Sequence, residues 1–64
     1  MTYHAVPARR VQGCPSKRFD NEADALSYAE RCARLFRVAY ATWRVGPSST
    51  LRLVRLARPP ALPR

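Results

Sequence analysis

Arginine is the residue type that gives this chain most of its capacity for specific interactions. Eleven of its twelve basic residues are Arg, and the 64-residue chain carries a net charge of +8. A guanidinium group forms paired hydrogen bonds with carboxylate or phosphate groups and stacks on aromatic rings. A GC-rich genome would explain Arg in place of Lys, but it would not explain the excess of base over acid. This balance predicts partners with acidic surfaces, either proteins or nucleic acids.

Residues for catalysis or metal binding are sparse. The chain has one histidine, His4, and two widely separated cysteines, Cys14 and Cys32, with no C-x-x-C or H-x-x-H pair. Ser48 and Ser49 lie in an expected turn without a neighbouring base. A nucleophile, a base and an orienting group cannot readily be assembled from these residues. We therefore expect no enzyme activity, no cofactor and no metal site.

The cysteines and the uncharged runs also limit where the chain can act. Without a signal peptide we expect a cytoplasmic location in a host cell, with Cys14 as a free thiol and Cys32 as a small core residue. No uncharged run approaches the ~20 apolar residues that span a bilayer, so we expect no membrane insertion.

The acidic residues mark the start of a helix over residues 21–35. Asp20 is a good N-cap, and Glu22 and Asp24 follow in the first turn, where the helix dipole favours negative charge. Apolar residues recur at spacings of three and four, which predicts one buried stripe of mostly small side chains. The members of this stripe are Ala25, Leu26, Ala29, Cys32, Ala33 and Phe36.

Three segments have strand character: residues 2–8, 37–45 and 51–57. The segment 12–18 contains Gly13 and Pro15 and is expected to be a loop, and 46–50 is a turn of hairpin length. The alternation in 51–57 slips by one residue, which a β-bulge near Val54 would repair. A short helix is the competing interpretation of 51–57. From residue 58 the Pro- and Arg-rich tail should be extended or disordered; its P-x-x-P motif also resembles a polyproline ligand.

These elements predict an α+β fold, a two-layer β-α-β-β domain over residues 1–57 with one helix on a small three-stranded, mostly antiparallel sheet. Ala39, Ala41, Trp43 and Val45 should line the face under the helix, where the small residues suit close packing. Val38, Tyr40, Thr42 and Arg44 should then form an uncovered face that binds a partner or a second copy. The predicted partner-binding residues are Arg9, Arg10, Arg37, Tyr40, Arg44, Arg52 and Arg55.

A capped, Ala-rich helix leads into a strand with aromatic residues: Phe19-Asp20-Asn21-Glu22-Ala23-Asp24-Ala25-Leu26-Ser27-Tyr28-Ala29, then Arg37-Val38-Ala39-Tyr40. In size, charge and layout the chain resembles small accessory proteins of phages and mobile elements, among them some anti-CRISPR proteins. This resemblance implies stoichiometric inhibition of a large host complex by surface contact. It carries no functional residue with it.

Three functional hypotheses follow. The first is a basic, non-enzymatic protein that inhibits a host protein or nucleoprotein complex through its Arg-rich surface. The second is direct binding of DNA or RNA by an Arg- and Tyr-bearing sheet face. The third is a structural subunit of a larger assembly, since a chain of this length builds only a thin core.

Overall fold

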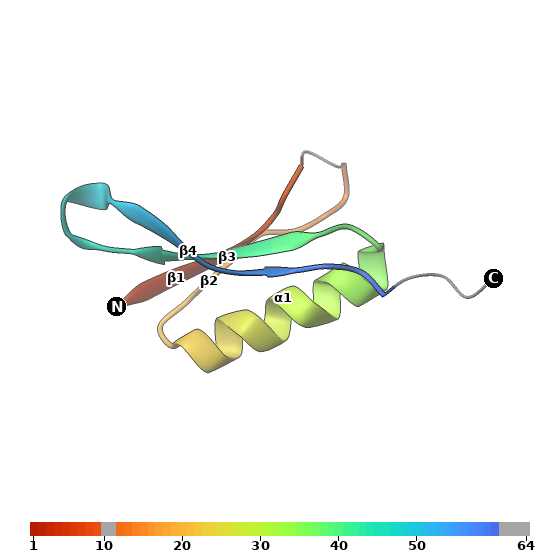
Figure 1. The fold of residues 1–64 in the computed structure, drawn as a ribbon, viewed down its shortest axis with the longest axis horizontal. Helices are drawn as coiled ribbons and strands as arrows, with labels where there is room; N and C mark the ends of the chain where they lie inside the picture. Colours follow the sequence, from red (N-terminus) through yellow and green to blue (C-terminus); the bar gives the residue numbers. More distant parts are fainter. Residues whose placement is uncertain (10–11, 61–64) are drawn as a thin grey trace.

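The computed structural model describes residues 1–9 and 12–60. The elements are β1 (Thr2–Pro7), β2 (Lys17–Phe19), α1 (Glu22–Phe36), β3 (Tyr40–Val45), a short 3-10 turn η1 (Pro47–Ser49) and β4 (Leu51–Ala57). The strands form one antiparallel sheet in the order β2-β1-β3-β4, and α1 lies along one of its faces (Figure 1). The predicted α+β class is confirmed, but the described residues form a sheet of four strands where three were predicted.

The additional strand is β2, which lies at the end of the segment predicted to be a loop. It pairs with β1 through three residue pairs, Tyr3 with Phe19, His4 with Arg18 and Ala5 with Lys17. The three residues of β2 follow a segment that contains Gly and Pro, and so short a strand carries no useful alternation signal. The strand forms because the chain turns back beside β1, where its backbone groups find partners.

The helix begins one residue later than predicted, with Asn21 as its N-cap in place of Asp20. The Asn21 side-chain oxygen accepts a hydrogen bond from the Asp24 backbone N–H at 2.8 Å, and the Asn21 amide donates to the Asp24 carboxylate at 2.8 Å. Arg37 ends the helix in the left-handed conformation, with φ 56° and ψ 39°. This conformation turns the chain back toward β3.

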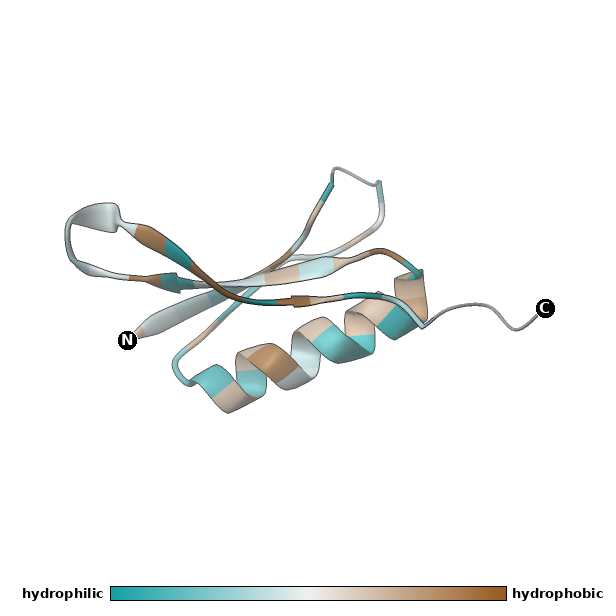
Figure 2. Cartoon of the chain, in the orientation of Figure 1, coloured by the Kyte–Doolittle hydropathy of each residue, from teal (hydrophilic) through white to brown (hydrophobic). Residues whose placement is uncertain are grey.

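The β3–β4 hairpin confirms the strand interpretation of residues 51–57 and the predicted bulge. Thr42 pairs with Arg55 and Trp43 with Leu53, so Val54 is the extra residue. Successive side chains of a strand point to opposite faces. The bulge therefore places Leu53 and Leu56 on one face although they are three residues apart, and Figure 2 shows hydrophobic and hydrophilic segments alternating along β4.

Among the described residues, the core under α1 is built mainly from small side chains. Tyr40 is its largest fully buried residue. Ala29 and Ala33 of the predicted stripe are 1% exposed and Cys32 is 4% exposed. Phe19 packs against Tyr28 with ring centroids 5.2 Å apart. Both described cysteines are free thiols. The role of Cys32 as a core residue is confirmed, and so is the small-residue part of the stripe. Phe36, its last predicted member, is 36% exposed.

The two faces of β3 are the reverse of the prediction. Tyr40 and Thr42 are each 0% exposed and face α1, whereas Trp43 lies on the side that α1 does not cover. Because the buried side chains of the helix are all small, the sheet contributes the large buried one, and Tyr40 fills the space. We call the uncovered side the open face. Its residues are His4, Val6, Ala41, Trp43, Val45, Leu51, Leu53 and Leu56.

Beyond β4 the chain runs through residues 58–60 without regular structure. The rest of the predicted tail, including most of the P-x-x-P motif, lies outside the described residues, as does Arg10. Among the described residues, no helix is long and apolar enough to cross a membrane.

Candidate binding surface

Two adjoining grooves run beside the second half of α1. The first has a volume of about 580 Å³ and lies on the outer side of the helix. The second has a volume of about 310 Å³ and lies between α1 and the end of β4. Glu30 and Arg34 line both grooves. Together the two grooves are lined by five arginines, which we call the arginine seam: Arg31, Arg34, Arg37, Arg55 and Arg58.

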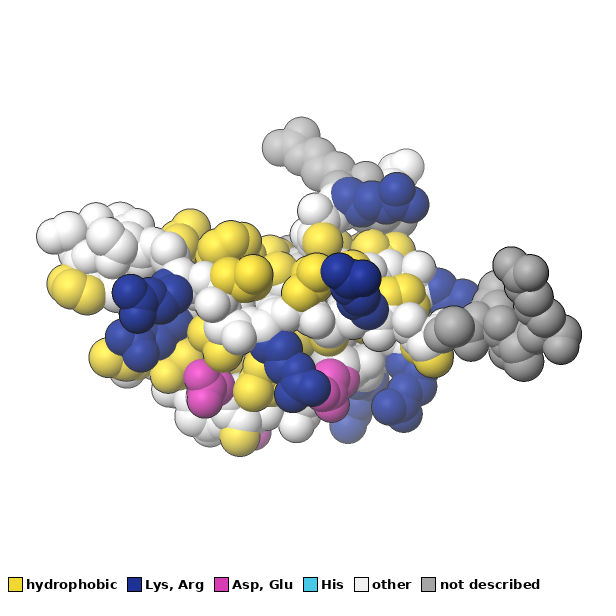
Figure 3. Space-filling model, in the orientation of Figure 1, with side chains coloured by type: hydrophobic (Ala, Val, Ile, Leu, Met, Phe, Trp, Pro, Cys, Tyr) yellow, Lys and Arg dark blue, Asp and Glu magenta, His cyan; other side chains and the backbone are white. Residues whose placement is uncertain are grey.

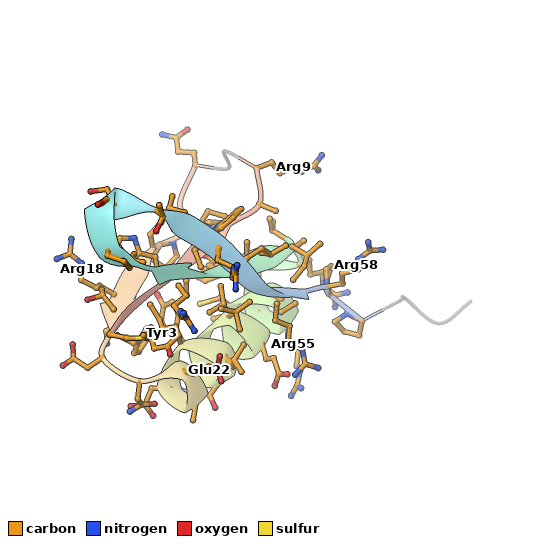
Figure 4. The ribbon with its side chains drawn as sticks, turned by 60° about the vertical axis from the view of Figure 1, so that its left-hand side comes forward. Tyr3, Arg9, Arg18, Glu22, Arg55 and Arg58 are labelled. Carbon is orange, nitrogen blue, oxygen red and sulfur yellow. The ribbon has the colours of Figure 1, made fainter. Side chains whose placement is uncertain are left out.

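Local structure explains why these arginines come together. Arg31 and Arg34 are three residues apart on α1 and therefore share one side of the helix. Arg37 follows directly where the helix ends. The bulge at Val54 turns Arg55 toward α1, and Arg58 is the first residue after β4. Figure 4 shows Arg55 and Arg58 at the same end of the molecule.

The arginine seam is strongly positive. Glu30 is the only acidic residue among those that line the two grooves, and its carboxylate lies 3.6 Å from the Arg55 guanidinium. Both side chains are about half exposed, at 61% for Arg55 and 49% for Glu30. Such a pair contributes only ~0–1 kcal/mol to folding, so Arg55 can be drawn to a partner at little cost.

Apolar side chains lie among these charges. Leu35 lines the first groove and is 70% exposed, and Leu56 lines the second and is 37% exposed. An exposed leucine beside several arginines combines an apolar contact with charged hydrogen-bond donors. This combination is typical of surfaces that bind proteins.

The structure brings together only part of the predicted set. Arg37 and Arg55 both belong to the arginine seam. Arg44 and Arg52 are cross-strand partners near the hairpin, where they line a separate groove of about 360 Å³. Arg9 extends from the β1–β2 connection, away from α1 (Figure 4). In Figure 3 the Lys and Arg side chains form separated groups, and acidic side chains lie over α1.

Tyr40 was predicted to anchor a partner on the surface, and that placement is wrong. Its side chain is fully buried, and its hydroxyl donates a hydrogen bond to the Pro15 carbonyl oxygen at 2.7 Å. Burial raises the pKa of the Tyr40 hydroxyl, so it stays protonated and keeps this bond. Tyr40 ties the β1–β2 connection to the core and has no surface left for a ligand.

Three members of the arginine seam were missed by sequence reasoning. Arg31 and Arg34 were not among the predicted contact residues, although their spacing of three already placed them on one side of the helix. Arg58 was assigned to the tail. Its closeness to Arg34 depends on how β4 lies against α1, which the sequence pattern does not specify.

The residue types that bind metal ions are dispersed over the part of the chain that the structure describes. No group of three or more His, Cys, Asp or Glu side chains gathers there to hold a metal ion. His4 lies on the open face beside Trp43, on a different side of the sheet from the arginine seam. In comparisons with known proteins, no family model, curated protein or solved structure matches this chain.

Proposed function

We propose that this chain is a non-enzymatic binding protein that uses the arginine seam to hold an acidic surface of a host protein or nucleoprotein complex. The observation that carries the proposal is the gathering of five arginines around two adjoining grooves that contain one carboxylate. Complementary charge steers such an encounter and fixes its orientation. By occupying the surface, the chain would inhibit the complex stoichiometrically.

The lining of the grooves favours a protein partner over a nucleic acid. Single-stranded nucleic acids are held by aromatic rings that stack on bases. None of the residues that line the two grooves is aromatic, and Leu35 and Leu56 take the apolar positions. Glu30 would also repel a phosphate backbone, whereas it can pair with a basic side chain at the edge of a protein contact.

Inhibition by surface contact is also what the resemblance to small phage proteins implies. A chain of this size can block a much larger complex by covering a site that normally meets another protein or a nucleic acid. An anti-CRISPR role is one form of this activity and belongs to the proposal.

The proposal is tested by affinity capture from nuclease-treated bacterial lysate with matched double variants. Arg31→Gln/Arg34→Gln removes two charges from the arginine seam, and Arg44→Gln/Arg52→Gln removes two from the hairpin. Because a hot-spot Arg contributes about 2 kcal/mol, we expect the first variant to bind a captured protein at least tenfold more weakly. The hairpin variant should bind like the unsubstituted chain.

Both variants have the same net charge, so a general attraction to polyanions would weaken binding equally in both. Equal loss in the two variants, or loss only in the hairpin variant, would overturn the assignment of the arginine seam. Circular dichroism spectra of both variants establish that the fold is retained.

Direct nucleic-acid binding is the second candidate. It is favoured by the net charge of +8 and by the Arg44–Arg52 pair, whose side chains lie on the same side of the sheet as α1. Titration of a DNA oligonucleotide at several salt concentrations separates the two functions. Contact with Z phosphates of B-form DNA gives a log–log slope of about −0.9Z. If the chain binds DNA tightly with such a slope, and both double variants lose this binding equally, nucleic acid would replace protein as the proposed partner.

A further inference from the structure

The open face is a second surface whose chemistry differs from that of the arginine seam. Trp43 lies at its centre, paired across the strands with His4 on one side and Leu53 on the other. Leu51, Leu53 and Leu56 are exposed by 59%, 49% and 37%. Within the described residues no helix lies on this side of the sheet, and the β1–β2 connection rises from it at one end (Figure 1). A contiguous apolar surface of this kind usually marks an interface.

Charge is arranged so that two open faces can meet. The side chains of Arg44, Arg52 and Arg55 all point to the helix side, because each pairs with or continues a helix-side position of the sheet. Among the described strand residues, Arg18 is the only charged side chain on the open side, and it lies on the outer strand β2. Two chains placed face to face would therefore keep their arginine seams on opposite outer surfaces. The basic side chains on this side, Arg18 and Arg9, lie toward β2, at the opposite edge of the sheet from the leucines of β4.

The chain exposes enough area for a dimer contact. Its total accessible surface is 5049 Å², so an interface of ordinary size would cover only part of it. A standard interface buries about 800 Å² on each partner.

The core gives a further reason for a second apolar layer. The largest fully buried side chains are Tyr40 and Thr42, and most of the other core residues are alanines. Such a core removes little apolar surface from water. The large apolar residues Trp43, Leu51 and Leu53 lie instead on the open face, where a covering layer would remove more of their surface from water.

We propose that two copies of this chain associate through their open faces, with Trp43 at the centre of the contact. The two sheets form a sandwich with a second apolar core, and the two helices lie on the outside. Each dimer then presents two arginine seams, one on each outer surface. This inference does not depend on what the arginine seam binds.

Sedimentation velocity over a range of concentrations tests the association. We expect a particle of twice the 7.3 kDa chain mass that dissociates on dilution. Leu53→Lys should raise the dissociation constant at least about 100-fold, because each dimer would bury two unpaired charges. Leu35→Lys is the matched control, since Leu35 is 70% exposed on the other side of the molecule. Leu51→Lys, at a more exposed position of the open face, serves if Leu53→Lys prevents folding.

Trp43 is the only tryptophan in the chain, so its fluorescence reports on the open face directly. Dimer formation should shift its emission to shorter wavelength and protect it from acrylamide quenching as concentration rises, and Leu53→Lys should abolish both changes. A monomer mass at every concentration, with Trp43 equally quenched throughout, would overturn the proposal. So would a dimer that dissociates in Leu35→Lys and persists in the open-face variants.

Discussion

The two faces of this sheet are made from the same strands but differ in what covers them and in their charge. On the helix side, small residues of α1 pack around Tyr40, and arginines surround the edges of that packing. On the open face, the leucines lie exposed around a partly buried Trp43, with hardly any charge among them. One side is closed by the chain's own helix and charged at its edge, and the other is apolar and uncovered.

This difference shows how a very small domain can carry two kinds of contact. A sheet one layer thick separates them except at the β4 edge, where Leu56 of the open face also lines the second groove. The bulge at Val54 maintains the separation along β4, because it directs Arg55 to one face and Leu56 to the other.

The sharpest way to test the comparison is to truncate one aromatic residue on each face. Tyr40→Ala should cost about 3–5 kcal/mol, as other aromatic truncations in cores do, and should leave the chain largely unfolded. Trp43→Ala, in dilute solution where the chain is monomeric, should remain folded because its ring is only partly buried. Urea unfolding followed by circular dichroism measures both. A folded Tyr40→Ala chain would show that the helix side is not the main core.

Alkaline pH should weaken the helix side specifically. Burial raises the pKa of Tyr40 above its ordinary value of 10.0, so the folded chain holds this proton more tightly than the unfolded chain. The stabilisation is complete below pH 10 and is lost as pH rises further, by up to about 1.4 kcal/mol per pH unit for one proton. Thermal unfolding at a series of pH values measures the slope. Tyr40→Phe should reduce it, and an unchanged slope in that variant would contradict the assignment.

Thr42→Val should stabilise the helix side. Thr42 is fully buried, and its hydroxyl oxygen has no hydrogen-bond partner. Replacing the hydroxyl by a methyl group of similar size removes an unsatisfied polar atom, a gain of about 1 kcal/mol. Thr50→Val is the contrasting variant, since the Thr50 hydroxyl donates to the Pro47 carbonyl oxygen at 2.9 Å and that variant should lose stability. Chemical denaturation of the two proteins should give changes of opposite sign.

Arg55→Gln should have the smallest effect on folding. The exposed ion pair with Glu30 contributes little, so the free energy of unfolding should change by less than about 0.5 kcal/mol. Binding of a partner to the arginine seam should nevertheless weaken. If stability and binding fell together by similar amounts, the charge on the helix side would belong to the fold as much as to the binding surface.

Local patterns made much of this fold predictable. The spacing of Ala25, Ala29 and Ala33 indicated the helix and its buried side, and the slipped alternation after Leu51 indicated both the strand and its bulge. These features depend on residues close together in the sequence, where propensity and periodicity act directly. The N-cap was misplaced by one residue because Asp20 and Asn21 are both good caps.

The candidate site was less predictable, because its residues meet only in the folded chain. Arg37 and Arg55 were predicted as contact residues, but nothing local shows that they share a surface with Arg34 and Arg58. Tyr40 was placed on the wrong face by the assumption that small sheet residues belong under the helix. The structure does the opposite, since a helix of small residues leaves a space that only a large side chain fills.

The sequence alone determined the helix, three of the strands, the excess of positive charge and the scarcity of catalytic groups. These follow from residue types and from spacings of two, three and four. The tertiary structure alone decided which face of the sheet the helix covers, that a fourth strand pairs with β1, and which arginines lie together. Each of these depends on packing between distant segments. The shape and volume of side chains select one arrangement among several that fit the local sequence pattern equally well.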